Sequence, residues 1–544
     1  MRSLNNLLFN SLEFLIFLPI VVGLYWSLRH KVYLQNALLL VASYFFYGWW
    51  DARFLFLIAV TTTVDYNIAL LLDRGTTTAK EKLTSTIFLI IGCGICITSD
   101  FSQQSSSLDL VSATILATLA IICLILFLPM VASVDKGNPR KRLITISVVT
   151  NLSILGFFKY FNFFVESFAS FYLATTGTEA SIPLLNIILP VGISFYTFQS
   201  MSYSIDVYRK ELRASKSLID FGAYLSFFPQ LVAGPIERGK NLLPQFQKSR
   251  SFSLEQFKEG IWLITWGLFK KIVIADNLAI FVNSVFWSYD SSNTTGLPEA
   301  GGLVTLIAVY AFAFQIYADF SGYSDIARGC AKLLGFELML NFNIPYISTN
   351  PSEFWQRWHI SLSSWLRDYL YIPLGGNRGS KFATQRNLML TMLLGGLWHG
   401  ANWTFLAWGF YQGLILVLYR TLGMESAGKG KTGLVKCLHI AWMFQLTCLG
   451  WLIFRSQNLP TISTFLTSIF TDMRITTESL DALTTLGMYC APLLAIQAYQ
   501  IYKDQLYVMI NLHWFARLNL WLTLILAILS LGTKKEVEFI YFAF

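Results

Sequence analysis

Long apolar segments recur along the whole chain, and they constrain its fold more than any other feature. A helix needs about 20 apolar residues to cross a bilayer, and it satisfies its backbone hydrogen bonds internally. The sequence therefore predicts an all-α, polytopic integral membrane protein with roughly ten to thirteen membrane segments, some of them bent or re-entrant. The candidate spans are 9–28, 34–50, 53–72, 83–98, 108–134, 143–172, 183–201, 259–286, 302–320, 388–420, 434–454, 483–502 and 514–532.

Composition and charge support this class. Hydrophobic residues make up 55% of the chain and charged residues only 13%, whereas soluble domains carry roughly a quarter of charged residues. The formal charge of +9 does not indicate a nucleic-acid partner, because the basic residues gather in short loops between apolar runs, as cytoplasmic loops do. These loops are 135–142, 208–216, 237–250 and 376–386.

Seven cysteines lie mostly within the apolar runs. Cys93 and Cys96 form a C-x-x-C pair, but no second pair and no nearby histidine accompanies them, so we interpret them as small apolar fillers. We expect no metal site and no bound cofactor.

Residues 345–410 interrupt the apolar pattern and contain six of the sixteen tryptophans. The run NPSEFWQRWHISLSSWLRDYLYI predicts one continuous helix, with Asn350 or Ser352 as its cap and Pro351 in its first turn. On such a helix Trp355, His359 and Ser363 lie along one line of an aromatic face.

A second helix is predicted to start near Asn387 and to pass through LMLTMLLGGLWHGANWTFLAWGF. Gly395, Gly396 and Gly400 leave part of its surface without side chains beside His399. We expect a neighbouring helix or a substrate chain to approach closely there.

Two histidines in this region are functional candidates. Burial keeps an imidazole neutral at pH 7, so that it can accept a proton, and ionisable groups at membrane depth are candidates by default. A hydrogen bond to a backbone carbonyl is the alternative role for His359 and His399. The other three histidines, His30, His439 and His513, lie beside basic residues or at span ends, where that structural role is favoured.

Several long motifs resemble membrane-bound O-acyltransferases, above all the bacterial branch that includes the membrane subunit of alginate O-acetyltransferases. The resemblance runs in order through nearly the whole chain. Its motifs are FNSLEFLIFLP, ASYFFYGWWDARF, LPVGISFYTFQSMSYSIDVYR, FFPQLVAGPIER, YADFSGYSDIARG, FNIPYISTNPSEFWQRWHISLSSWLRDYLYIPLGGNR, LLGGLWHGANW, WLIFRS and EFIYFAF.

The resemblance implies a single membrane domain over residues 1–544, with a motif-bearing catalytic core at 190–420 around a central pore. Residues 75–142 depart from the family pattern, because they contain two extra apolar runs. The implied activity is O-acetylation of an extracytoplasmic polysaccharide such as alginate, with acetyl-CoA as the cytoplasmic acyl donor. A separate periplasmic or extracellular acetyltransferase and a bacterial inner membrane are implied as partner and location.

The motifs carry over two residues: the histidine of LWHG is His399, and that of RWHISLS is His359. Forming an ester from a thioester requires a hydroxyl that loses its proton as it attacks, which a neutral imidazole supports as general base. We assign this role to His399, with His359 orienting the acceptor or sharing the proton.

Five further residues are expected to contact the substrate: Trp398, Trp355, Ser363, Asp319 and Tyr323. For the polar residues of YADFSGYSD, including Asp319 and Tyr323, mutual hydrogen bonding with a basic partner is equally favoured. Arg357 and Arg367 could attract donor phosphates, but Glu353 and Asp368 beside them favour ion pairs.

Other functions remain open at this point. The runner-up among enzymes is teichoic-acid D-alanyl transfer, in which the acyl group comes from a carrier protein. A transporter or channel without acyl chemistry, or a non-catalytic scaffold, would also need many spans and buried polar groups.

Overall fold

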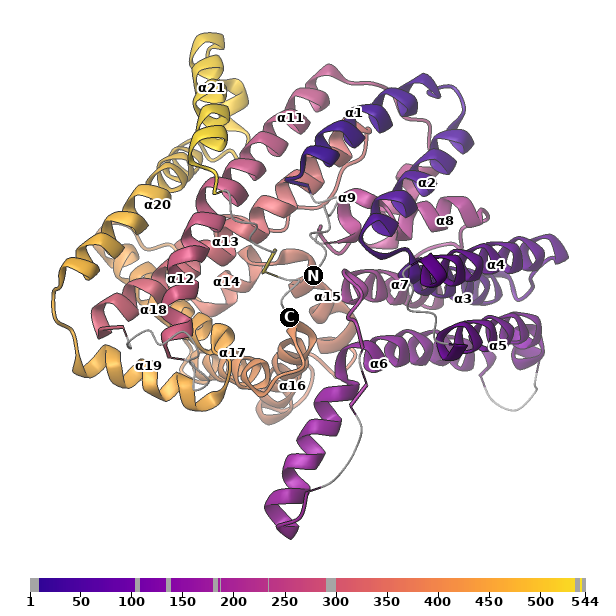
Figure 1. Cartoon of the computed structure of the whole chain (residues 1–544), viewed down its shortest axis with the longest axis horizontal. Coiled ribbons are helices and arrows are strands. Elements are labelled where there is room, and N and C mark those ends of the chain that lie inside the picture. Colours follow the sequence, from indigo (N-terminus) through magenta and orange to yellow (C-terminus); the bar gives the residue numbers. More distant parts are fainter. Residues whose placement is uncertain are drawn as a thin grey trace. The chain divides into compact units, whose positions relative to one another are not determined.

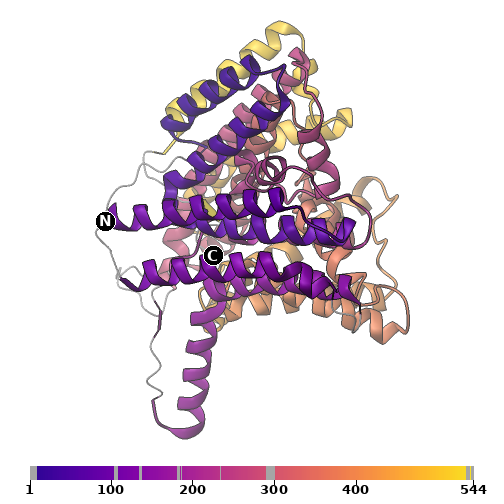
Figure 2. The same cartoon turned by 90° about the vertical axis from the view of Figure 1, so that its right-hand side faces the viewer.

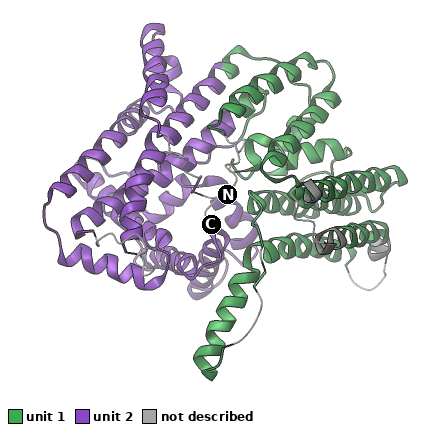
Figure 3. Ribbon diagram, in the orientation of Figure 1, with its two compact units in different colours: residues 1–257, 330–338 green, residues 258–329, 339–544 purple. Residues whose placement is uncertain are grey.

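The computed structural model describes residues 9–102, 108–133, 138–179, 184–185, 187–232, 234–289, 300–533 and 539–540. All regular elements in these ranges are helices, which confirms the all-α expectation (Figure 1). The helices gather into two compact units, residues 1–257 with 330–338 and residues 258–329 with 339–544 (Figure 3).

The first unit contains the helices of the N-terminal half. The two extra apolar runs of the 75–142 region form α4 and α5. The bounds are α1 Leu12–Ser27, α2 Val32–Asp51, η1 Ala52–Phe54, α3 Leu55–Arg74, α4 Ala79–Ser102, α5 Leu108–Ser133, α6 Pro139–Thr176, α7 Ile193–Tyr208, α8 Leu218–Leu225, α9 Phe228–Leu231 and α10 Gly239–Gln247.

Helix α3 is the core of this unit and packs against α4, α6 and α7 (Figures 1 and 2). Its carboxylate Asp65 is fully buried, which an apolar environment penalises unless the charge is hydrogen-bonded. Four neutral side chains of α6 and α7 donate to it: Ser147, Asn151, Ser200 and Ser204. Serine and asparagine at these positions therefore make a buried aspartate compatible with close helix packing.

The second unit contains the histidine region. Helix α11 begins in the first unit and ends here, and α13 ends in the first unit. The bounds are α11 Leu254–Leu268, η2 Phe269–Ala275, α12 Asp276–Ser288, α13 Gly302–Leu333, η3 Pro345–Ile347, α14 Pro351–Arg357, α15 Ile360–Leu366, η4 Arg367–Tyr371, α16 Lys381–His399, α17 Trp403–Thr421, α18 Gly433–Arg455, α19 Leu459–Thr471, α20 Thr477–Lys503, η5 Val508–Asn511 and α21 Trp514–Leu531.

Seven helical segments of the described residues are long and apolar enough to cross a membrane. The first has 43 residues and contains both α2 and α3, so it is long enough for two passes. Three shorter apolar helices add to them: Leu12–Ser27, Thr114–Leu126 and Leu459–Thr471. The seven are Val32–Arg74, Ala79–Ser99, Pro139–Thr176, Gly302–Leu333, Gly433–Arg455, Thr477–Lys503 and Trp514–Leu531.

Both helices that were expected to run through the histidines are interrupted, and the sequence prediction was wrong here. The first divides into α14 and α15 at Trp358 and His359, and the second into α16 and α17 after His399. The second break follows from local chemistry: Gly400 is extended, and the side chain of Asn402 caps α17 by accepting from the Thr404 N–H.

Candidate active site

His359 occupies the break between α14 and α15. Its backbone has φ 43° and ψ 53°, a left-handed conformation that costs a non-glycine residue about 1–3 kcal/mol. The turn therefore redirects the histidine away from the line with Trp355 and Ser363 that a continuous helix would give. Upstream, the expected cap is confirmed: the Asn350 side chain accepts from the Glu353 N–H at 2.9 Å, and Pro351 opens α14.

Asn341 is the polar neighbour of this turn. Its Oδ1 lies 3.2 Å from Nδ1 of His359 and accepts from the Ser361 hydroxyl at 2.9 Å. Its backbone carbonyl accepts from the Ile360 N–H at 2.9 Å. One buried asparagine thus holds both the ring and the backbone at the break.

Aromatic rings surround the rest of the His359 imidazole. Phe320 lies edge-on at 4.7 Å between centroids, and Trp398 lies at 5.9 Å. The side chain is fully buried and lies outside the seven candidate spans. Because burial penalises the charged form, the pKa of His359 falls from 6.5 to about 3, and the ring is neutral at pH 7.

His399 ends α16 inside a cage of aromatic rings. Its imidazole meets Trp398, Trp408 and Phe454 nearly perpendicularly, at 5.1, 5.0 and 5.3 Å between centroids. Only 5% of the residue is exposed. Since both imidazoles lie against Trp398, their centroids are at most about 11 Å apart. The structure therefore brings the two candidate histidines within about one helix diameter of each other.

The glycines beside His399 allow close helix packing, as the sequence predicted. A Cβ on Gly396 would overlap with the carbonyl oxygen of Phe405 and lie 3.0 Å from Cα of Gly409. A Cβ on Gly400 would overlap with the Phe405 ring. Helices α16 and α17 therefore approach backbone to backbone, and this contact supports the cage around His399.

Trp355 and Ser363, two expected substrate contacts, flank the break. The Trp355 indole lies edge-on to Trp408 at 5.9 Å, so it is one ring away from His399. The Ser363 hydroxyl donates to the Trp358 carbonyl at 3.1 Å, and the Ser363 N–H donates to the His359 carbonyl. Ser363 thus stabilises the turn.

Asp319 and Tyr323 of α13 contact the C-terminal segment. Asp319 pairs with Lys271 at 3.0 Å and accepts from the Ile540 N–H at 2.8 Å. The Tyr323 ring lies 4.1 Å from Phe539. Lys271 also pairs with Asp276 at 2.7 Å. These contacts agree with the alternative interpretation. In it, the polar residues of YADFSGYSD form hydrogen bonds and ion pairs within the protein, with a basic residue as partner, and do not contact the substrate.

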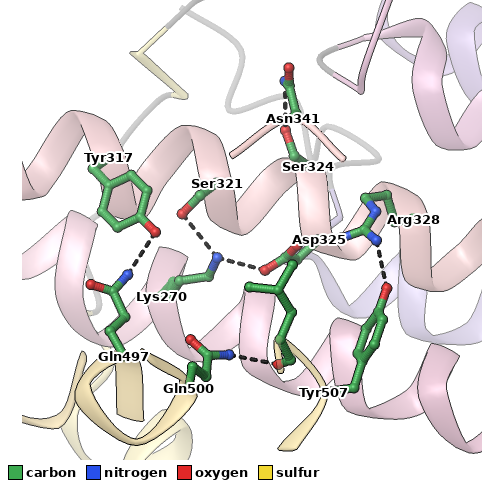
Figure 4. Close-up of polar contacts among 11 residues, drawn as sticks. Lys270, Tyr317, Ser321, Ser324, Asp325, Arg328, Asn341, Gln497, Gln500 and Tyr507 are labelled. Atoms are coloured by element: carbon green, nitrogen blue, oxygen red, sulfur yellow. Dashed lines mark hydrogen bonds and ion pairs between the residues drawn. The ribbon is translucent and has the colours of Figure 1, made fainter. Parts of the chain in front are cut away.

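Ser321 and Asp325 of YADFSGYSD contact Lys270 (Figure 4). Together with Tyr317 they line a cavity of about 40 Å³. Lys270 donates to Ser321 at 2.9 Å and to Asp325 at 2.7 Å. Arg328 adds a 3.4 Å ion pair to Asp325. Together with the Lys271 pairs, three basic side chains are paired with three acidic ones.

The two arginines that could attract donor phosphates are paired instead. Arg357 contacts Glu353 at 3.0 Å, and Arg367 contacts Asp368 at 2.7 Å.

Sequence reasoning missed Asn341, Trp408 and Phe454 as neighbours of the histidines. Asn341 carried a usable signal, since it is an amide between apolar residues in LMLNF. Trp408 stands in LAWGF and Phe454 in the motif WLIFRS, and neither run indicates which of its rings meets a histidine.

Comparison with known proteins identifies the family. The model of the membrane-bound O-acyltransferase family matches residues 95–423, more than half of the chain, including both histidines. The chain belongs to this family. It is therefore a membrane-bound O-acyltransferase, and the resemblance noted from its motifs is confirmed.

Three relatives of this acyltransferase differ in their identity to it and in the share of its chain that they match. A probable alginate O-acetylase, AlgI, of Azotobacter vinelandii is 40% identical over 83% of the chain and 76% of its own length. A peptidoglycan O-acetyltransferase of Helicobacter pylori is 31% identical over 83% of the chain and 78% of its own length. A teichoic acid D-alanyltransferase of Streptococcus thermophilus is 31% identical, over 51% of the chain and 69% of its own length.

Proposed function

We propose that this acyltransferase moves an acetyl group from a cytoplasmic donor, acetyl-CoA, across a bacterial inner membrane for O-acetylation of an extracytoplasmic polysaccharide such as alginate. The similarity to a probable alginate O-acetylase supports the substrate class. The observation that carries the chemistry is the pair of buried imidazoles that both contact Trp398.

In the proposed reaction His399 is the general base. The acceptor hydroxyl oxygen attacks the thioester carbonyl carbon, its proton passes to the His399 imidazole, and the carbon–sulfur bond breaks. The proton then goes from the imidazolium to the departing thiolate, which restores the neutral ring. The aromatic cage excludes water, which would compete with the acceptor by hydrolysing the thioester.

A separate periplasmic or extracellular acetyltransferase completes the transfer to the polymer in this proposal. The acceptor hydroxyl in the membrane then belongs to that partner or to a carrier. If the purified protein alone acetylated a polysaccharide efficiently, this division of labour would be wrong.

The experiment that tests the proposal uses membrane vesicles of known orientation with labelled acetyl-CoA on the cytoplasmic side. Label is expected on an extracytoplasmic acceptor, and no label on that side would contradict the proposed transfer.

Teichoic-acid D-alanyl transfer is the second candidate, supported by the match to a D-alanyltransferase over half of the chain. Transfer of D-alanine from a carrier protein, without transfer of acetyl, would favour it. Solute flux without acyl transfer would instead favour a transporter.

A further inference from the structure

Asn341 contacts His359 through one end of its side-chain amide. The other hydrogen bonds at that end show whether it is the oxygen or the nitrogen. The same end of its amide receives the backbone N–H of Ser361 at 3.3 Å and the Ser361 hydroxyl at 2.9 Å. A backbone N–H can only donate, so this end of the amide is the oxygen. The NH₂ end donates to Ser324 of α13 at 3.1 Å (Figure 4).

This orientation determines which nitrogen of His359 carries the proton. The amide oxygen only accepts, and it lies 3.2 Å from Nδ1. The neutral imidazole has a single N–H, and hydrogen bonding to Oδ1 places it on Nδ1. Nε2 then has the lone pair, and it is the ring atom that can accept a hydrogen bond or a proton.

We propose that Asn341 is a positioning residue that holds His359 in the Nδ1–H tautomer, so that Nε2 keeps the lone pair with which His359 can share the acceptor's proton with His399. The inference rests on the proposed function for the hydroxyl. The tautomer itself rests on the contacts of Nδ1 with Asn341 and, at 3.4 Å, with the Ser361 hydroxyl, which donates its own hydrogen to Asn341. In the opposite tautomer Nε2 would already carry a hydrogen, and His359 could not share the acceptor's proton.

The backbone contact of Asn341 adds a second constraint. The Ile360 N–H donates to its carbonyl immediately after the left-handed turn at His359. Asn341 is itself 1% exposed, and its amide is tethered to α13 by Ser324. The ring and the turn that carries it are therefore fixed by one residue that touches no reacting atom.

The direct test is nitrogen NMR of the full-length protein with ¹⁵N-labelled histidine. The chain has five histidines, and the spectrum of His359→Gln identifies the signal of interest by its absence. We expect Nδ1–H in the wild type and in Asn341→Asp, which keeps an oxygen acceptor. Asn341→Leu should lose this preference. Observation of the Nε2–H tautomer in the wild type would overturn the proposal.

Kinetics provide the second readout. Misplacement of a reacting group by about 1 Å can cost about 100-fold, so Asn341→Leu should lower kcat about 100-fold with little change in KM. Asn341→Asp should recover most of this loss. The matched control is Asn387→Leu, another buried asparagine, whose amide contacts the Gly376 carbonyl and not His359. It should cost stability without changing the His359 signal.

The two proposals fail in different ways. If neither the wild type nor any variant transfers acetyl, the proposed function is wrong, and the NMR signal still tests the tautomer. If Asn341→Leu retains the wild-type kcat at matched abundance, Asn341 does not position His359. If that variant is not produced, the wild-type spectrum and Asn341→Asp still decide between the two tautomers.

Discussion

His359 and His399 share one neighbour, the indole of Trp398, which lies 5.9 Å from the first ring and 5.1 Å from the second. The two histidines are 40 positions apart and come from different helices. A single aromatic side chain therefore contacts both rings. This relationship predicts that the volume of residue 398 matters more than its hydrogen-bonding capacity.

Trp398 is best tested by a pair of substitutions. Trp398→Phe keeps a ring between the histidines and should retain transfer within about tenfold, whereas Trp398→Ala opens a cavity and lets both rings move. Loss of precise placement can cost about 100-fold, and we expect a loss of that size for the alanine variant. The measurement is acetyl label transferred at matched membrane abundance. Equal rates for the two variants would contradict a spacing role.

His399 gives the most direct test of the proposed base. His399→Ala should reduce transfer by about 10²–10⁴-fold, because that is the usual contribution of a positioned base. His399→Gln should fail as well, since an amide keeps hydrogen bonding but accepts no proton near neutral pH. The assay is label transfer from acetyl-CoA, with abundance measured in the same membranes.

The result distinguishes two roles of this histidine. Transfer by His399→Ala at the wild-type rate would refute the base assignment. Loss of both abundance and transfer would instead indicate that His399 stabilises the aromatic cage. His359→Ala should also lower transfer, by less, if its role is to orient the acceptor.

The sequence predicted the helical class and the proximity of His359 and His399, but not the breaks at which they lie. Apolar periodicity and motif spacing report which residues are buried together, and they placed His359 and His399 in one region. No glycine marks the left-handed turn at His359 in the sequence. The turn is held by contacts from Asn341, which is distant in the chain, and local sequence patterns do not report such contacts. The break after α16 was marked by Gly400 and by Asn402, which caps α17, yet the continuous apolar run outweighed that signal.

Gly396 should be intolerant of any side chain. A methyl group there overlaps with the Phe405 carbonyl, which is backbone and cannot rotate away. Gly396→Ala should therefore destabilise the protein by about 1–3 kcal/mol, the usual cost of overpacking. The control is the adjacent Gly395→Ala, whose Cβ meets only a methyl of Leu366 at 3.1 Å, and it should cost less. Thermal unfolding of the purified protein in detergent measures the difference, and equal midpoints for the two variants would show that α16 and α17 separate readily.

Asp319 decides between a substrate-lining and a structural role for the YADFSGYSD segment. Asp319→Asn keeps an oxygen that can accept from the Ile540 N–H but removes the charge that faces Lys271. Breaking a buried ion pair costs about 3–5 kcal/mol, and the cost here should lie near the lower limit because Lys271 retains Asp276 at 2.7 Å.

We therefore expect a lower thermal midpoint for Asp319→Asn, with little change in label transfer per folded molecule. Asp319→Ala should lower the midpoint further, since it also leaves the Ile540 N–H without its acceptor. The opposite pattern, an unchanged midpoint with transfer reduced by tenfold or more, would place Asp319 on the substrate path. Because stability and transfer are measured on the same preparations, one experiment separates the two roles.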